Sequence, residues 1–336
     1  MPGLRLRHRY PFAVRVPSRP LVVWLALGIL YVVWGSTYLG IKLALDGFPP
    51  FFMTGVRYTI AGALVMVFIA IRGNFRATPR QWLGVFISGA IMIPIGNGGV
   101  VWGEQYLGSG VAAIVVSTMP FWIALLSWLL LGDRLSIWTG LGLALGFGGL
   151  VVLVGPTRVR QDELLGVAVV LVAAFGWGLG TVLIKKLAAP DNAFLVSGMQ
   201  MFCGGLVATL ISLLTGDAFR FKPAALHPGA AAAFVYLILV GAILGYGVFQ
   251  WLVKNAPLPL VSTYAYVSPV VAVILGILVL GEHLSAHAIA GGAIVVAGVA
   301  VIVTAQALED RRRPVAGLET ESAKAAAPAL GPSGGR

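Results

Sequence analysis

The chain has 336 residues, of which 59% are hydrophobic and only 10% are charged. A soluble domain carries roughly a quarter charged residues, so this composition excludes an ordinary water-soluble fold and indicates a polytopic membrane protein. The formal net charge is +11, but the cations crowd into the tails and alternate loops, which argues against nucleic-acid binding. The single cysteine, Cys203, excludes a disulfide framework.

The N-terminal segment is basic. Five arginines lie within residues 1–20, ahead of an apolar run that begins at Leu21. This arrangement resembles the charged region of a signal peptide, but no small-x-small cleavage site follows the run. We therefore expect a retained first span, preceded by a cytoplasmic basic tail over 1–20.

Apolar stretches of about 20 residues, long enough to cross the hydrocarbon of a bilayer, then recur along the chain. Ten spans are expected, near 21–43, 51–71, 82–102, 109–131, 137–155, 164–186, 194–214, 230–252, 259–280 and 287–305. The segment 306–336 is rich in Ala, Pro, Gly and Ser and is expected to form a disordered cytoplasmic tail.

The Lys and Arg residues of the loops predict the orientation. One side would hold both tails and the loops that contain Arg72, Lys185 and Lys254. The other side would hold only Arg158, Arg160, Arg220 and Lys222. Cytoplasmic loops carry the excess of cations, so both termini are expected in the cytoplasm of a multi-pass protein of the cell inner membrane.

The two halves of the chain repeat one pattern. Pro120 matches Pro269 at a shift of 149 positions, and Trp34 matches Trp177 at a shift of 143. Five spans per copy is an odd number, so the second copy would enter the membrane upside down relative to the first.

The sequence therefore predicts an all-α membrane protein whose ten transmembrane helices form a 5+5 inverted structural repeat. The first repeat would cover 21–156 and the second 164–305. Secondary transporters commonly use this architecture, with the substrate site near the midplane between the halves.

Several motifs resemble the drug/metabolite transporter superfamily, and more narrowly its ten-span EamA family and the YedA-like exporters. They are WGSTYLGIK, the arginine of GVRYTIAG, IGNGGVVWGEQ, GVAAIVVSTMPFWIAL, and STYAYVSPVVAVILG with GEHLS. The resemblance covers residues 21–305. It implies a ten-helix bundle that moves small metabolites or toxic compounds outward across a bacterial inner membrane.

We expect a secondary exporter of small metabolites (amino acids or related compounds) or drugs, which works by alternating access around a midplane cavity. A nucleotide-sugar or other organic-anion exchanger or facilitator of the same superfamily is the alternative. No ATP-binding loop exists. An intramembrane enzyme is the distant alternative, because no catalytic constellation is recognisable.

Arg57 is the sharpest candidate for substrate binding, because a cation within a span is costly. It is expected either to meet a substrate carboxylate or phosphate, or to act as a structural cation that snorkels or binds backbone carbonyls. Gln200 takes its place in the second repeat. Lys42, at the end of the first span, is expected to be interfacial.

Glu104 is a candidate gate or coupling residue. It is expected to titrate in proton coupling or to pair with Arg57 or Lys42 in an outer gate, unless it is a solvated loop residue. Asp133 and Glu282 occupy matching places after two spans and are expected to order tight turns with Arg134 and His283. Ser136 and Ser285 resemble helix N-caps.

Pro120 and Pro269 each remove one backbone hydrogen bond from a helix. Nearby hydroxyl groups, such as those of Ser117 and Ser268, are placed to bind the freed carbonyls. We expect either a paired hinge or two static kinks, and the match between the two copies favours the hinge.

A set of aromatic and polar residues within the spans is expected to line a mostly apolar cavity with a few polar anchors. With Arg57, the candidates for substrate binding are Trp34, Thr37, Tyr38, Asn97, Trp177, Gln200, Tyr246, Gln250 and Tyr264. Core packing is the alternative for each of them.

Glycines fit the same architecture, since small residues let helices approach closely in lipid. Gly142, Gly146 and Gly149 lie on one face of the fifth predicted span, and Gly298 marks the tenth. We expect them to pack these spans rather than to form a dimer interface. The expected partners are a small-molecule substrate, the lipid bilayer and protons as the coupling ion, in a monomer or weak homodimer without nucleic acid, cofactor or metal.

Overall fold

The computed structural model describes residues 20–132, 137–154, 161–256 and 264–312, and every regular element in this part of the chain is a helix. The predicted basic tail and most of the predicted C-terminal tail lie outside these ranges. The helices of the first half are α1 (Pro20–Ala44), α2 (Pro50–Ile71), α3 (Pro79–Ile91), the π-helix η1 (Met92–Asn97), α4 (Gly98–Gly103), α5 (Ser109–Val116), α6 (Met119–Leu131) and α7 (Ile137–Val154).

The second half follows a similar order. Its helices are α8 (Gln161–Lys186), α9 (Ala193–Leu214), the short 3₁₀ turns η2 (Asp217–Arg220) and η3 (Pro223–Ala225), α10 (Pro228–Tyr236), the π-helix η4 (Leu237–Leu244), α11 (Gly245–Asn255), α13 (Tyr264–Leu280) and α14 (Ala286–Arg312). α14 continues past residue 305, where the tenth span was expected to end.

Among the described residues, seven helical segments are long and apolar enough to cross a membrane. They are Leu21–Ala44, Pro50–Ile71, Pro79–Gly103, Ser109–Leu131, Gln161–Lys186, Ala193–Leu214 and Pro228–Phe249. Shorter apolar helices cover Val267–Leu280 and Ala286–Gly298. The three remaining predicted spans correspond to α7, α13 and α14.

Local sequence explains where two of the helices begin. Thr78 forms a capping box with Gln81: the Thr78 hydroxyl accepts from the Gln81 amide at 3.3 Å, and the Gln81 side chain accepts from the Thr78 amide at 2.8 Å. The Asn192 side chain accepts from the amides of Phe194 and Leu195 at the start of α9. These bonds satisfy amides that the first helical turn leaves unpaired.

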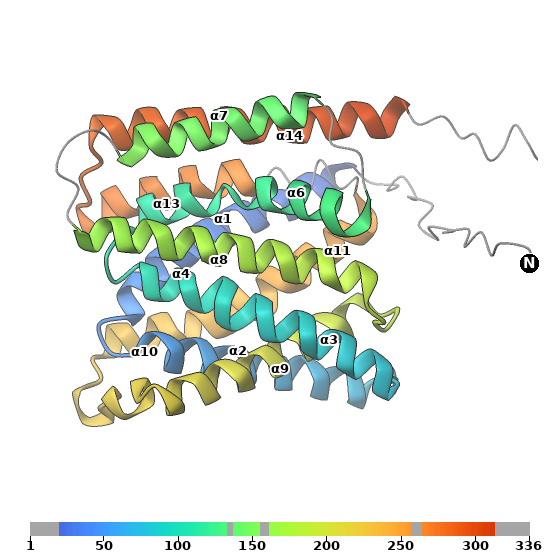
Figure 1. Ribbon diagram of the computed structural model, residues 1–336. Helices are drawn as coiled ribbons and strands as arrows, with labels where there is room; N and C mark the ends of the chain where they lie inside the picture. The colour runs from blue at the N-terminus through green and yellow to red at the C-terminus, as the bar shows by residue number, and fades with distance from the viewer. Residues whose placement is uncertain (1–19, 133–136, 155–160, 257–263, 313–336) are drawn as a thin grey trace, which may run out of the picture.

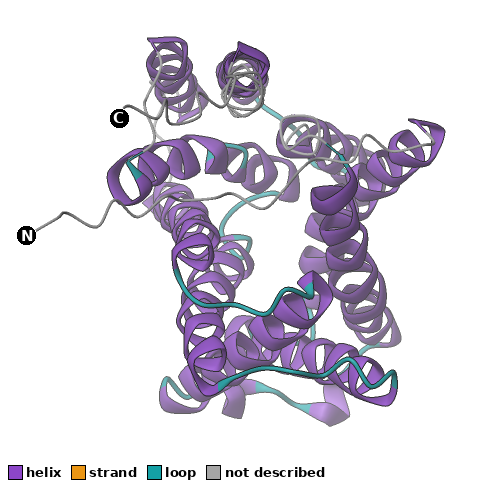
Figure 2. Ribbon diagram, turned by 90° about the vertical axis from the view of Figure 1, so that its right-hand side faces the viewer, coloured by secondary structure: helices purple, strands orange, loops and turns teal. Residues whose placement is uncertain are grey.

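The helices run side by side between two ends of the bundle (Figure 1). We call the end that contains the C-termini of α1 and α4 the Glu104 end, and the end that contains the C-termini of α2 and α8 the Arg72 end. The Glu104 end lies on the left in Figure 1. Figure 2 views the helices nearly end-on, arranged around a central axis.

The two halves pack against each other mainly through α2 with α9 and α7 with α14. Glycines allow the close approach. A Cβ at Gly298 would lie 2.7 Å from the Gly142 carbonyl oxygen, and one at Gly149 would lie 2.7 Å from the Val295 amide nitrogen. The expectation that these glycines pack the fifth and tenth predicted spans is confirmed, because they join the two spans to each other.

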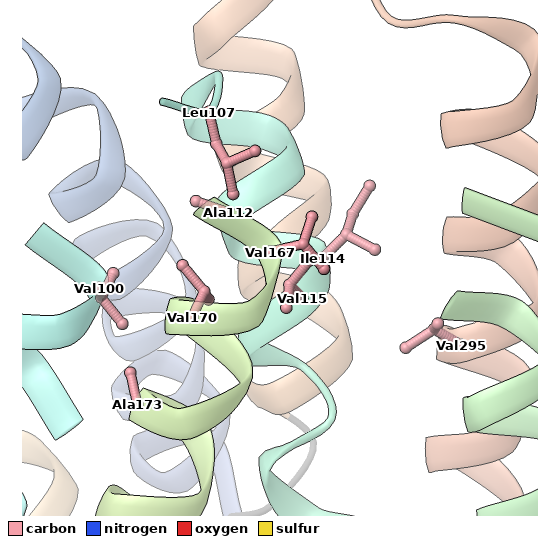
Figure 3. Packing of buried hydrophobic residues seen from close by; sticks show 9 residues of the cluster. All are labelled: Val100, Leu107, Ala112, Ile114, Val115, Val167, Val170, Ala173 and Val295. Carbon is pink, nitrogen blue, oxygen red and sulfur yellow. The ribbon is translucent and has the colours of Figure 1, made fainter. Parts of the chain in front are cut away.

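One buried hydrophobic cluster joins α5 to α8 at the centre of the bundle (Figure 3). Ala112, Ile114 and Val115 of α5 face Val167 and Val170 of α8. The other members of this cluster are Val100, Leu107, Ala173 and Val295. The cluster holds α5 beside α8 and fixes one wall of the space described below.

The two π-helices occupy corresponding places in the halves, each between two α-helical segments of one span. η1 separates α3 from α4, and η4 separates α10 from α11. A π-turn inserts an extra residue into the helical ladder and is frequent at functional sites. Both π-helices border the central cavity.

Candidate functional site

A cavity of about 100 Å³ lies among α1, α2, η1, α5, α8, η4, α11 and α13. Nine of the residues predicted from the sequence line it: Trp34, Thr37, Tyr38, Arg57, Asn97, Trp177, Tyr246, Tyr264 and Pro269. They come from six different helices and from both halves of the chain. The structure thus brings most of the predicted set to one place.

Aromatic rings form much of the cavity wall. The Tyr246 ring lies between the two equivalent tryptophans, with its centroid 5.9 Å from that of Trp34 and 5.9 Å from that of Trp177. Trp34 also packs edge-on against Tyr264, at 4.8 Å between centroids. The geometry suits an apolar or aromatic body, which such rings contact over a large area.

Arg57 supplies the permanent positive charge of this cavity wall. Its side chain is only 3% exposed and donates a hydrogen bond from Nη2 to the Asn97 side-chain oxygen. The guanidinium also lies over the Tyr58 ring, 4.5 Å from the centroid, in a cation–π contact. The expected alternative, a cation that snorkels to the interface, is wrong because the side chain is buried.

The Arg57 guanidinium keeps binding capacity. Its buried Nε has no hydrogen-bond partner among the described residues, and a guanidinium has five N–H donors in a planar fork. Such a fork binds a carboxylate or phosphate with two parallel hydrogen bonds. Arg57 can therefore anchor an anionic group inside the cavity.

The two prolines differ in their local structure. The helix is interrupted before Pro120, where α5 ends at Val116 and α6 begins at Met119, and Pro120 lies in the first turn of α6. Pro269 lies within the continuous α13 and lines the cavity. The Ser117 hydroxyl donates to the Ile114 carbonyl at 2.6 Å, which is not the carbonyl of residue 116 that a proline at position 120 deprives of its helical donor.

The predicted residue Gln200 does not line this cavity. Gln200 is buried between α3, α8 and α9, where its Nε2 donates to the Ser88 hydroxyl, which in turn donates to the Gly180 carbonyl, both at 2.8 Å. This satisfied network holds the amide away from the cavity. Gln250 belongs to α11, but its side chain is outside the part of the chain that the structure describes.

The Glu104 end contains the other predicted site residue. Glu104 follows α4 and is fully buried, so the alternative of a solvated loop residue is wrong. The Lys42 ammonium donates to two backbone carbonyls, that of Glu104 at 2.6 Å and that of Leu107 at 2.9 Å. Lys42 thus ties α1 to the loop between α4 and α5.

Glu282 has a different role from the expected one. Its carboxylate accepts from the amides of Ser109 at 2.7 Å and Gly110 at 3.2 Å, so it caps the N-terminus of α5 instead of ordering its own turn. The amides at a helix start favour an anion. Asp133, Arg134 and Ser136 lie outside the described ranges, whereas the N-cap role of Ser285 is confirmed by its bond from the Ala288 amide at 3.1 Å.

A second hollow, with a volume of about 760 Å³, lies toward the Arg72 end. It is bordered by Phe68, Arg72, Asn192 and Ser197, and it shares Tyr246 with the central cavity. The ring of Tyr246 therefore stands between the central cavity and the hollow on this side.

Some functional features could not be recognised from the sequence. Tyr58 stacks on Arg57 and lines the cavity. The only sequence feature that could have indicated this position is that Tyr58 follows Arg57 in the chain. Gly96 and Gly241 line the cavity from the two π-helices. No feature of the sequence marks these two segments as π-helices. The cap formed by Glu282 depends on a contact across 172 positions.

Comparisons with known proteins agree with this picture of a transporter. The EamA-like transporter family matches residues 22–155 and again residues 164–304. The Escherichia coli K12 protein "Uncharacterized inner membrane transporter YedA" is 32% identical over 261 residues, which cover 77% of this chain and 83% of that protein. The Bacillus subtilis "Uncharacterized transporter YvbV" is 26% identical over 280 residues, 83% of this chain and 91% of its own length.

A solved crystal structure shares the fold, with a TM-score of 0.60, 20% sequence identity, and coverage of 84% of this chain and 97% of the other. The two family matches cover most of the chain, and the resemblance expected from the motifs is confirmed. The chain belongs to the EamA-like transporter family and is a membrane transporter.

Proposed function

We propose that this protein is a secondary transporter of the bacterial inner membrane that exports small metabolites bearing a carboxylate and an apolar or aromatic body. The observation that carries the proposal is the cavity in which buried Arg57 faces aromatic walls. Amino acids and related organic acids have this chemistry. The name of the Escherichia coli relative, an inner membrane transporter, supports the location.

The proposed architecture is the ten-helix inverted repeat. The helix contacts support it, because they are reciprocal between the halves: α1 packs on α13, and its counterpart α8 packs on α6. α2 packs on its own counterpart α9, and α7 on α14. A two-fold axis in the membrane plane would relate these pairs.

The proposed mechanism is alternating access. The Glu104 end is closed by contacts between the halves, through Glu282 with the start of α5. The larger hollow lies toward the Arg72 end, which we place in the cytoplasm because the loops there carry the excess of cations. In this state, cargo would reach Arg57 from the cytoplasm past Tyr246.

The experiment that tests the function is extracellular metabolite profiling of bacteria that overexpress the protein. We expect a carboxylate-bearing compound to accumulate outside cells with the intact chain, but not with the double variant Trp34→Ala, Trp177→Ala at equal membrane abundance. Accumulation of nucleotide sugars would select the organic-anion alternative. If no compound differs, even under added toxic amino acids and drugs, the export proposal is wrong.

A further inference from the structure

Three charged side chains from different parts of the chain meet at the Glu104 end: Lys42 of α1, Glu104 after α4 and Glu282 after α13. Two of them are satisfied by the backbone. Lys42 binds the carbonyls of Glu104 and Leu107, and Glu282 accepts from two amides of α5. These contacts join α1, the α4–α5 loop and the end of α13, and so close this end.

Glu104 is the exception in the cluster. Its side chain is 0% exposed, and neither carboxylate oxygen has a hydrogen-bond partner among the described residues. The Lys42 ammonium, which could have paired with it, is committed to backbone carbonyls. An ionised carboxylate without donors is very costly to bury, whereas the protonated form is much cheaper.

The electrostatic surroundings favour the protonated form on balance. Burial is the main cause that raises the pKa of Glu104 well above its ordinary value, the charge of Glu282 raises it further, and Lys42 and Arg57 oppose the rise. Tyr38, which lines the central cavity, also interacts with Glu104. Glu104 follows the last residue of the span Pro79–Gly103, so opening this end would expose it to water.

We propose that Glu104 is a proton-binding site of the transport cycle, occupied while the outer end is closed and emptied when that end opens. The inference rests on the proposed function and on the orientation that places the Glu104 end outside. Closing the end removes the carboxylate from water and takes up one proton, which forms an O–H bond on the carboxylate. Opening rehydrates the group and releases the proton to water.

The cavity is linked to this site through Arg57. The guanidinium is one of the two cations that oppose protonation of Glu104. An anionic cargo on Arg57 would neutralise that cation, so cargo and proton would bind cooperatively, and the cooperativity is reciprocal by linkage. Binding of an organic anion would therefore favour the closed state, in which Glu104 carries the proton.

The sign of the pH effect follows from the raised pKa. The closed state binds the proton more tightly than the open state, so closure is favoured at low pH. Between the ordinary carboxyl pKa and the raised pKa of the closed state, each unit of rising pH shifts the closed-to-open ratio tenfold toward the open state. Above the raised pKa the ratio stops changing.

The test measures the separation of the outer ends and needs no substrate. Spin labels are placed at Gln105→Cys and His283→Cys, both exposed positions, in a Cys203→Ser background, and the distance distribution is recorded from low to high pH in lipid nanodiscs. We expect the wild-type distribution to change from closed to open as the pH rises.

Glu104→Gln should remain closed at every pH, and Glu104→Asp should restore a pH response with a shifted midpoint. Asp46→Asn is the matched control, because Asp46 is an exposed carboxylate at the same end, and it should respond as the wild type does. Difference infrared spectra should show a protonated carboxyl band that titrates with the opening and is lost in Glu104→Gln alone.

A pH response of Glu104→Gln equal to that of the wild type would overturn the proposal, as would a wild-type distribution that does not change with pH. These outcomes are separate from those of metabolite profiling. If the protein exports a compound but its outer end does not respond to pH, the proton-site proposal is wrong and the proposed function stands. If the outer end responds to pH through Glu104 but no compound is exported, the proposed function is wrong and the proton-binding site stands.

Discussion

Arg57 combines a permanent charge with almost complete burial, and that combination needs compensation from its neighbours. The Asn97 oxygen and the Tyr58 ring provide part of it. The Nε atom has no partner among the described residues, and a buried donor without an acceptor costs about 1–3 kcal/mol. A bound carboxylate would remove this cost, which supports the proposal of an anionic cargo.

Replacing Arg57 by Gln should therefore strongly reduce export of a carboxylate cargo while leaving neutral drugs unaffected. Hydrogen bonds to charged groups contribute about 1.5–3 kcal/mol, which corresponds to a loss of binding of about 10- to 100-fold. Counterflow of the exported compound into proteoliposomes measures the effect. Arg76→Gln, which removes an equal charge from an exposed loop, is the control and should transport normally. Equal transport of an amino acid by Arg57→Gln would remove the proposed role.

At this scale the sequence predicted residue types better than it predicted contacts. Arg57, Trp34 and Trp177 could be singled out because polar and aromatic groups are conspicuous in an apolar span. Gln200 has the same character, but it is used for a buried bond to Ser88. The distinction depends on which face of a helix meets the cavity, and spans that are apolar all round give no such direction.

The helices that border the cavity are irregular in both halves. η1 and η4 are π-helical segments, which are wider than the α-helices around them. The break between α5 and α6 places Ser117 at the cavity wall. Irregular backbone at membrane depth is tolerated where it is buried in protein or lines a cavity. These places are where a helix can bend without loss of lipid-facing hydrogen bonds.

The double variant Pro120→Ala, Pro269→Ala should slow turnover more than it weakens binding, because alanine restores a backbone donor and stiffens both helices. Exchange rates and binding affinity of the exported compound, measured on the same proteoliposome preparation, separate the two effects. An exchange rate unchanged from that of the wild type would reduce the prolines to static kinks.

Gly205→Ala should destabilise the contact between α2 and α9, because the added Cβ would meet the backbone of Thr59. Overpacking of this kind costs about 1–3 kcal/mol, so the thermal unfolding midpoint in detergent should fall. Gly28→Ala is the control, since no atom lies within 4 Å of a Cβ at that position. If the thermal unfolding midpoint of Gly205→Ala equals that of the wild type, α2 and α9 can move apart at little cost and the prediction is wrong.

Hydropathy predicted the positions of the helices well but not their internal form. The predicted span near 230–252 corresponds to a run of three helical segments from Pro228 to Asn255. A π-turn changes the hydrogen-bond partner without changing composition, so apolar length cannot reveal it. The break at Ser117 was marked in advance by Pro120, which cannot continue a helix without loss.

On the scale of the whole molecule, α7 and α14 form a pair that packs mainly on itself and touches the other helices through α5, α6 and α13 (Figure 1). The remaining helices enclose the cavity. The pair joins the two halves on one side of the bundle, while α2 and α9 join them on the opposite side. The cavity thus lies between two glycine-rich contacts that join the halves.

The proposed orientation predicts that both termini are cytoplasmic. A green fluorescent protein fused after residue 336 should fluoresce, and alkaline phosphatase at the same place should be inactive, because each reporter matures on one side only. Alkaline phosphatase inserted next to Arg220, in the loop between α9 and α10, should be active. The reverse pattern of activities would invert the orientation and place Glu104 at the cytoplasmic end.

The position shared by Arg57 and Gln200 has a consequence for the shape of the cargo. The residue of the first half places a charge at the cavity, whereas the residue of the second half donates its amide to Ser88. The parts of the cavity lining that come from the two halves of the chain therefore differ. Arg57, Trp177 and Tyr264 provide three dissimilar contact points around the cavity. A stereocentre next to the carboxylate would present its substituents to these points in only one hand, so mirror-image forms of one cargo should leave the cell at different rates.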